Sequence, residues 1–242
     1  MGCRRARYDP NLRIIGVACH IGSQLTELSP LCDALGRVLD FVDQLEADGI
    51  ALEHIDFGGG LGVRYRDETP PSPAQYGAAI VEQMRARAPE LPVIIEPGRA
   101  IVGNAGVLLT RVNCIKHGDA SNFCVVDAGM NDLLRPALYQ SHQEIVEVEQ
   151  AAPADAGEYD VVGPVCESSD FLGKARRLRV RESDLLAVRT AGAYGAVMSS
   201  NYNARPRPAE VMVDGDQFHI VRQREAIEDL YRGESTLNDE TT

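Results

Sequence analysis

A thiol and a carboxylate, Cys166 and Glu167, lie side by side in a stretch rich in turn-forming residues, 163–170. A free cysteine is most often a chemically inert, small hydrophobic residue. In polar surroundings, however, a thiol can donate a proton in a reaction. Cys166 is therefore a candidate proton donor, and the interpretation as a packing residue remains open.

A second pair of charged residues, Glu96 and Arg99, belongs to the segment Glu-Pro-Gly-Arg that follows the apolar run 92–96. A carboxylate beside a pyridine nitrogen keeps that nitrogen protonated, and this makes the ring electron-withdrawing, as a pyridoxal phosphate (PLP) protein requires. The two residues could equally form a simple ion pair. The segment favours a cofactor role for Glu96 without excluding a structural one.

Glycines Gly58, Gly59 and Gly60 also follow an apolar run, and glycine lets backbone N–H groups approach an anion closely. Their spacing differs from the dinucleotide motif G-x-G-x-x-G, so the segment indicates a phosphate loop or only a turn. His20 and Ser23 end another run. An imidazole there could cover a flat ring while the hydroxyl bonds its phosphate, or His20 could be a core residue.

Tyr194 lies between glycines in the segment 192–195, and residues 198–203 (Met-Ser-Ser-Asn-Tyr-Asn) follow with many hydrogen-bonding groups. An aromatic hydroxyl in such a segment could contact a polar ligand. Both segments could also be turns between strands.

Three apolar runs that read as buried strands lie at 12–19, 51–57 and 92–96, and each leads into one of these motifs: His20 and Ser23, the glycines, and Glu-Pro-Gly-Arg. Apolar residues spaced by three and four predict helices over 30–48 and 74–88, the first of them ended by Gly49. Alternation of strand and helix predicts a parallel α/β architecture, with its site at the carboxyl ends of the strands.

The pattern changes near residue 105, where short β-rich stretches separated by turns begin. These stretches predict a mainly antiparallel β-domain with a short closing helix near 224–231. We place the partial barrel at 12–105 and the β-domain at 106–233, with a surface loop at 150–157 and a disordered tail at 234–242. The β-rich stretches are 107–115, 122–127, 144–149, 158–163, 185–190, 208–213 and 217–222.

Composition excludes several function classes. A net charge of −12 disfavours nucleic acid as a partner, and no apolar run is long enough to span a membrane. Six cysteines without metal-ligand spacing predict no metal site and fit the reducing cytoplasm. Lysine is scarce, since Lys116 and Lys174 are the only two.

In their order and spacing, seven motifs resemble the diaminopimelate decarboxylases, which belong to the alanine-racemase-like, fold-III PLP enzymes. The resemblance runs from about residue 12 to 233. It implies the C-terminal part of a PLP-binding (β/α)8 barrel followed by a mainly antiparallel β-domain, in a homodimer with active sites at the subunit interface. The motifs are C-H-I-G-S-Q, G-G-G-L-G, E-P-G-R, R-P-A-L-Y, G-P-V-C-E-S-S-D, A-G-A-Y-G and M-S-S-N-Y-N-A-R-P-R-P-A-E-V.

The resemblance also implies contacts with the cofactor. His20 would stack on its ring, and Ser23 with the glycine loop would hold its phosphate. Glu96 would pair with the ring nitrogen, while Arg99 would reach both the phosphate surroundings and the substrate carboxylate. The implied cofactor-binding residues are His20, Ser23, Gly58, Gly59, Gly60, Glu96, Pro97, Gly98, Arg99 and Tyr194.

On the substrate side, Arg135 and Tyr139 would bind the carboxylate, and Tyr194 would contact both phosphate and substrate. Cys166 would return a proton to the substrate carbon. Glu167 would read the distal end of the substrate, and both residues would reach into the partner subunit's site.

The resemblance implies decarboxylation of meso-2,6-diaminopimelate to L-lysine, the last step of lysine biosynthesis. The family's cofactor lysine precedes the segment that contains His20, whereas Lys116 and Lys174 lie in the β-domain half. We therefore expect this chain alone to be inactive. The alternatives are a decarboxylase for ornithine, arginine or carboxynorspermidine, and a non-catalytic fragment.

Overall fold

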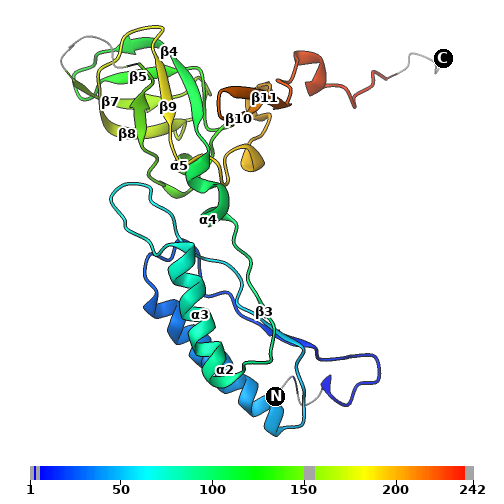
Figure 1. Ribbon diagram of the computed structural model, residues 1–242. Coiled ribbons are helices and arrows are strands. Elements are labelled where there is room, and N and C mark those ends of the chain that lie inside the picture. Colours follow the sequence, from blue (N-terminus) through cyan, green and yellow to red (C-terminus); the bar gives the residue numbers. More distant parts are fainter. Residues whose placement is uncertain (1–2, 4–5, 150–155, 238–242) are drawn as a thin grey trace. The chain divides into compact units, whose positions relative to one another are not determined.

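The computed structural model describes residues 3, 6–149 and 156–237. The chain forms two compact units, and the boundary between them falls between Ala105 and Gly106 (Figure 1). Within the described residues, no helix has both the length and the apolar character that crossing a membrane requires. Each unit is a separate structural body and has its own core.

The first unit alternates strands with helices. Its three strands are parallel neighbours in the order β1-β2-β3, as the sequence pattern predicts. A short helix and a 3-10 turn, neither of them predicted, follow the third strand. The elements are β1 (Gly16–Ala18), α2 (Ser29–Ala47), β2 (His54–Asp56), α3 (Pro73–Arg87), β3 (Val93–Ile94), α4 (Arg99–Val102) and η1 (Gly103–Ala105).

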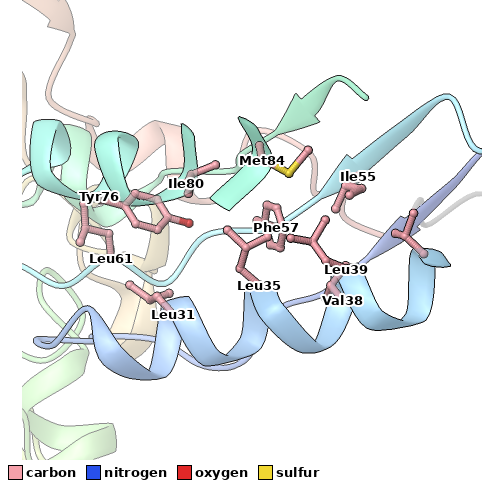
Figure 2. Packing of buried hydrophobic residues seen from close by; sticks show 11 residues of the cluster. Leu31, Leu35, Val38, Leu39, Ile55, Phe57, Leu61, Tyr76, Ile80 and Met84 are labelled. Atoms are coloured by element: carbon pink, nitrogen blue, oxygen red, sulfur yellow. The ribbon is translucent and has the colours of Figure 1, made fainter. Parts of the chain in front are cut away.

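Helices α2 and α3 lie within one residue of their predicted bounds because the residues that begin and end them have a strong preference for those positions. Ser72 caps α3 by accepting the Gln75 N–H, and the Gln75 side chain accepts the Ser72 N–H in return. Gly49, at φ +74°, ends α2 by donating to Glu46. Figure 2 shows both helices packing their apolar residues against Ile55 of β2 and against Phe57, which directly follows that strand.

The second unit is built around a six-stranded sheet with the order β6-β9-β4-β5-β7-β8. All neighbouring pairs are antiparallel except β5 and β7, which are parallel. A separate antiparallel hairpin, β10–β11, follows. The strands are β4 (Leu108–Lys116), β5 (Phe123–Val126), β6 (Ile145–Glu147), β7 (Gly157–Val162), β8 (Phe171–Leu178), β9 (Leu185–Val188), β10 (Glu210–Asp214) and β11 (Gln217–Arg222).

Seven of these eight strands coincide with predicted β-rich stretches, and β8 is the strand that the sequence did not predict. The predicted closing helix is the 3-10 helix η4 (Ile227–Leu230). Of the predicted surface loop at 150–157, residues 150–155 lie outside the described residues, and β7 already begins at Gly157. Residues 234–237 have no regular secondary structure, and the rest of the predicted tail lies outside the described residues.

Short helical segments also interrupt the β-rich unit. They follow β5 and β9 along the chain and carry several of the predicted site residues. They are α5 (Arg135–Tyr139), η2 (Ala196–Met198) and η3 (Tyr202–Ala204).

Candidate functional site

The carboxyl ends of the three parallel strands bring His20, the glycine loop and Glu96 to one edge of the first unit. The loops stay in register beyond the strands: the Cys19 N–H donates to Asp56 at 2.8 Å, and the Glu96 N–H donates to Gly58 at 2.7 Å. His20 and Glu96 are exposed there. Residues that are far apart in sequence therefore share one accessible edge.

Backbone crowding explains the glycines of this edge. Gly58 and Gly60 have φ angles of +62° and +109°. A Cβ on Gly58 would lie 2.8 Å from the Cys19 carbonyl oxygen, and one on Gly59 would clash with the carbonyl of Glu96. The loops can approach one another only without side chains at these positions.

Two N–H groups of the glycine loop already have partners within the protein. The Gly58 N–H donates to Asp56 at 2.8 Å, and the Gly59 N–H donates to Nδ1 of His20 at 3.3 Å. The second bond fixes the imidazole ring against the loop. In this structure the loop therefore orients His20 directly.

Arg99 is the buried cation of this edge. Only 7% of it is exposed, and its Nη2 donates to the Ser23 hydroxyl at 2.9 Å. Its Nη1 donates to the hydroxyl of Tyr65, a residue that the sequence did not single out. A guanidinium held beside two hydroxyls fits an anionic group such as a phosphate.

The turn Pro97–Gly98 connects the exposed Glu96 to this buried cation. Arg99 begins helix α4 directly after Gly98. A carboxylate and a guanidinium three residues apart thus have different environments, one accessible and one buried. The arrangement fits a ligand with a cationic nitrogen at one end and a phosphate at the other, as PLP has.

In the second unit, Arg135 lies between two aromatic rings. Its guanidinium carbon is 5.2 Å from the ring centre of Tyr139 and 5.3 Å from that of Tyr194. Cation–π contacts on two sides restrict the plane of the guanidinium, and a planar guanidinium matches the geometry of a carboxylate. The structure thus brings three of the predicted substrate-binding residues together.

The segment that carries Tyr194 is held by close backbone contacts. Tyr194 has a φ of +61°, in the left-handed region that non-glycine residues rarely adopt. A Cβ on Gly195 would clash with the carbonyl of Ala191, and the Ala191 N–H donates to Gly106 at 2.9 Å. These contacts hold the backbone that carries Tyr194.

Cys166 and Glu167 lie on the loop between β7 and β8, and both are exposed. The hydroxyl of Tyr202 donates to Oε2 of Glu167 at 3.4 Å. Tyr202 belongs to the segment 198–203, which the sequence identified as rich in hydrogen-bonding groups. The structure places that segment beside the thiol-bearing loop.

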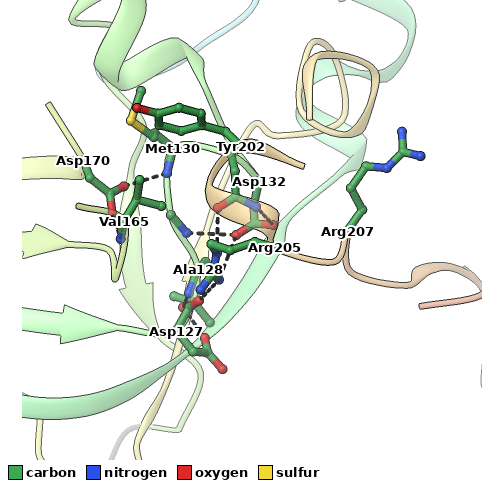
Figure 3. A network of polar contacts seen from close by, with 12 residues as sticks. Asp127, Ala128, Met130, Asp132, Val165, Asp170, Tyr202, Arg205 and Arg207 are labelled. Atoms are coloured by element: carbon green, nitrogen blue, oxygen red, sulfur yellow. Dashed lines mark hydrogen bonds and ion pairs between the residues drawn. The ribbon is translucent and has the colours of Figure 1, made fainter. Parts of the chain in front are cut away.

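A polar network beside this loop joins residues 127–132 to Arg205 (Figure 3). Arg205 donates from Nε to the Asn131 side chain at 2.9 Å and from Nη2 to the Asp127 carbonyl at 2.6 Å. The same guanidinium lies 3.8 Å from Asp132, of which 7% is exposed. Burial raises the pKa of Asp132, and the bond from the Gly129 N–H and the charge of Arg205 oppose that shift.

The predicted site residues thus form two sets, one in each unit. His20, Ser23, Gly58–Gly60, Glu96 and Arg99 lie together in the first unit, whereas the second contains the Arg135 cluster and the Cys166 loop. The sequence analysis missed Tyr65, Asn131, Tyr202 and Arg205. The last two belong to the M-S-S-N-Y-N-A-R-P segment, so a signal existed for them, but their partners depend on tertiary contacts.

The parallel α/β edge with its buried cation, followed by an antiparallel sheet unit, defines a PLP-type architecture. A family model described as pyridoxal-dependent decarboxylase, C-terminal sheet domain, matches residues 8–192. The chain belongs to this family of pyridoxal-dependent decarboxylases, and the predicted fold class is confirmed.

Comparison with individual relatives is more specific than the match to the family model. The chain is 54% identical over 228 residues to the diaminopimelate decarboxylase of Haemophilus influenzae and 57% identical over 236 residues to that of Pseudomonas aeruginosa. These alignments cover 94% and 97% of the chain. The resemblance to diaminopimelate decarboxylases is therefore confirmed. The chain spans about half the length of these relatives, 55% of each.

Solved structures of diaminopimelate decarboxylases are similar to this chain as well. The Helicobacter pylori diaminopimelate decarboxylase complexed with L-lysine matches with a TM-score of 0.85 at 40% identity, over 94% of this chain and 56% of that one. The M. jannaschii enzyme in co-complex with L-lysine matches with a TM-score of 0.90 at 36% identity, over 97% and 55%.

Proposed function

We propose that this chain forms the C-terminal part of an enzyme that decarboxylates meso-2,6-diaminopimelate to L-lysine with PLP, the last step of lysine biosynthesis. The observation that carries the proposal is the identity of 54–57% to diaminopimelate decarboxylases across nearly the whole chain. The open edge of the first unit and the aromatic-flanked Arg135 support it, since they suit a phosphate and a carboxylate.

When bound, PLP supplies an electron-withdrawing ring that accepts the electron pair released as CO2 departs. In the proposed site, Glu96 holds the proton at the ring nitrogen, and His20 covers the ring. Ser23 and Arg99 bind the phosphate, together with Gly60 of the glycine loop.

The second unit provides the groups that act on the substrate. Arg135 and Tyr139 bind its carboxylate, Tyr194 contacts substrate and phosphate, and Glu167 binds the distal amino-acid end. The Cys166 thiol donates a proton to the carbon that lost CO2. Both Cys166 and Glu167 act in the site of the partner subunit.

We further propose that the enzyme is a cytoplasmic homodimer without nucleic-acid or membrane partners. All six cysteines are free, which suits a reducing compartment. The net charge of −12 disfavours contact with phosphate backbones.

The test is a chimaera in which this chain replaces the corresponding part of the Haemophilus influenzae relative. We expect CO2 release from meso-diaminopimelate and L-lysine as the product. Release from ornithine or arginine instead would favour the alternative substrates, and a folded, PLP-binding chimaera without turnover would contradict the proposal. In the active chimaera, Cys166→Ala is expected to slow turnover and leave PLP absorbance unchanged.

A further inference from the structure

The loop that carries Cys166 and Glu167 is closed at its base by the sheet. Val162 at the end of β7 pairs with Phe171 at the start of β8, and the Gly163 N–H donates to the Asp170 carbonyl at 3.1 Å. These contacts fix the two ends of the loop. They do not by themselves fix the exposed residues in its middle.

The Asp170 carboxylate reaches the middle of the loop. Its Oδ2 accepts the Val165 N–H at 2.6 Å, directly before Cys166, and its Oδ1 accepts the Met130 N–H at 2.7 Å (Figure 3). Only 5% of Asp170 is exposed. One buried carboxylate thus ties the backbone beside the thiol to the segment that Arg205 anchors.

Two glycines leave room for this carboxylate. A Cβ on Gly163 would lie 2.5 Å from Oδ2 of Asp170, and one on Gly129 would lie 3.1 Å from Oδ1. Neither glycine has a positive φ angle, so space and not backbone conformation accounts for them. The packing around Asp170 therefore depends on its shape as well as its charge.

Burial of a carboxylate carries a free-energy cost because the charged form loses its hydration. Burial raises the pKa of Asp170, while the N–H bonds from Met130 and Val165 oppose the shift. An apolar residue would avoid that cost but could not accept two N–H groups. The carboxylate suits a position where both donors must be held at once.

From this geometry we propose that Asp170 is a positioning residue for Cys166 and sets the place from which its thiol donates a proton. The catalytic part of this inference rests on the role proposed for Cys166. Asp170 acts through the Val165 backbone and does not itself contact the substrate. Its removal loosens the middle of the loop while the pairing of Val162 with Phe171 remains.

The decisive variant is Asp170→Asn, in which an NH2 group replaces one acceptor and faces a backbone donor. The matched control is Asp160→Asn. Asp160 lies on β7, and its Oδ1 accepts the Ala175 N–H at 2.8 Å, outside the Cys166 loop. Both variants remove one carboxylate bond to a backbone N–H, but the Asp160 bond joins strands β7 and β8, whereas one of the Asp170 bonds lies within the Cys166 loop.

The first measurements need no catalysis. Amide hydrogen exchange of the 242-residue chain is expected to show Val165 and Met130 protected, and Asp170→Asn should speed their exchange about tenfold to a hundredfold. Iodoacetamide should then label Cys166 at an altered rate relative to the exposed Cys114. Asp160→Asn should change neither quantity. Unchanged exchange and labelling in folded Asp170→Asn would overturn the proposal.

If Asp170→Asn fails to fold, amide hydrogen exchange of the unmodified chain tests the proposal instead. A Val165 amide that exchanges as fast as an unprotected loop amide is incompatible with the proposed anchor, and a protected one supports it. These readouts do not depend on turnover. An inactive wild-type chimaera would therefore count against the proposed function alone.

The catalytic measurement is a double-mutant cycle in the chimaera. Asp170→Asn alone is expected to lower kcat about tenfold. In the Cys166→Ala background it should have little further effect on kcat, because the group that it positions is absent. A general structural role would lower kcat by the same factor in both backgrounds, and that result would refute positioning through Cys166.

Discussion

The guanidinium carbon of Arg135 lies 5.3 Å from the ring centre of Tyr194, a residue from a distant segment of the chain. Because Tyr139 flanks the same guanidinium, its plane is fixed before any ligand arrives. A planar donor with a fixed orientation can bind a carboxylate through two parallel bonds, which an ammonium cannot do.

Arg135→Lys is therefore expected to weaken substrate binding although the charge is kept. Loss of one charged hydrogen bond, about 1.5–3 kcal/mol, corresponds to a KM about tenfold to a hundredfold higher. Steady-state kinetics of the chimaera measures it. Arg189→Lys is the control, because Arg189 forms an exposed ion pair with Glu144 at 2.8 Å. Equal effects of the two substitutions would contradict the role of Arg135.

Arg205→Ala is expected to destabilise the second unit. The change removes two hydrogen bonds and leaves Asp132, whose side chain is 5% exposed, without its countercharge. We expect a loss of about 2–4 kcal/mol in the free energy of unfolding, measured by urea denaturation. Arg222→Ala breaks the exposed pair with Glu210 and should cost less than about 1 kcal/mol. A loss no larger than that of Arg222→Ala would refute the anchoring role.

The pair Arg207–Glu225 predicts a pH-dependent contribution to stability. Bonds from Arg207 lower the pKa of Glu225 from 4.5 to about 2. Since the folded-state value is the lower one, the contribution is fully present above pH 4.5 and is lost as the pH falls through 2. The Tm difference between the unmodified chain and Glu225→Gln should shrink over this range.

The carboxyl groups of Asp132 and Asp170 change the stability with pH in the opposite direction, since burial raises the pKa of both. Their contributions are fully present below the unfolded value of 3.8 and are lost as the pH rises through the raised values. These two contributions cancel in the Tm difference between the unmodified chain and Glu225→Gln, because both proteins contain Asp132 and Asp170. A Tm difference that does not vary with pH would contradict the Arg207–Glu225 assignment.

Gly59→Ala is expected to distort the edge of the first unit where the glycine loop lies beside Glu96, and so to weaken PLP binding. Its Cβ would clash with the Glu96 carbonyl and force the glycine loop away from the carboxylate that we propose for the ring nitrogen. PLP affinity of the chimaera, followed by absorbance, should fall at least about tenfold. Gly77→Ala in helix α3, where a Cβ meets nothing within 4 Å, should stabilise by about 0.5–1 kcal/mol and leave PLP binding unchanged. Normal affinity in Gly59→Ala would disprove the crowding argument.

The sequence predicted those elements whose burial follows a simple period. Helix α2 shows it, since Leu31, Leu35 and Leu39 repeat along its buried face. Strand β8 was missed because FLGKARRL carries charges at Lys174 and Arg176 and lacks a clear alternation. Its place depends on pairing with β7, and that is a tertiary property.

Residue types identified the candidate site, but not the supports of its side chains. Cys166 and Glu167 were found from their chemistry, whereas the Tyr202 hydroxyl on Glu167 joins segments that only the fold brings together. Similarly, Asp170 stood in the quoted motif, but its bond to the Met130 N–H could not be read from spacing. Contacts between residues far apart in the sequence produce no periodic pattern in it, so sequence periodicity cannot predict them.

The strand order of the second unit has a consequence for the way the chain folds during synthesis. Strand β9 pairs with both β4 and β6, so one edge of β4 and the ladder of β6 stay uncovered until residues 185–188 have left the ribosome. Pairing over such sequence distances is slow and leaves strand edges available to other chains. A nascent chain stalled before β9 is therefore the form most exposed to misassembly and the one for which chaperone binding matters most.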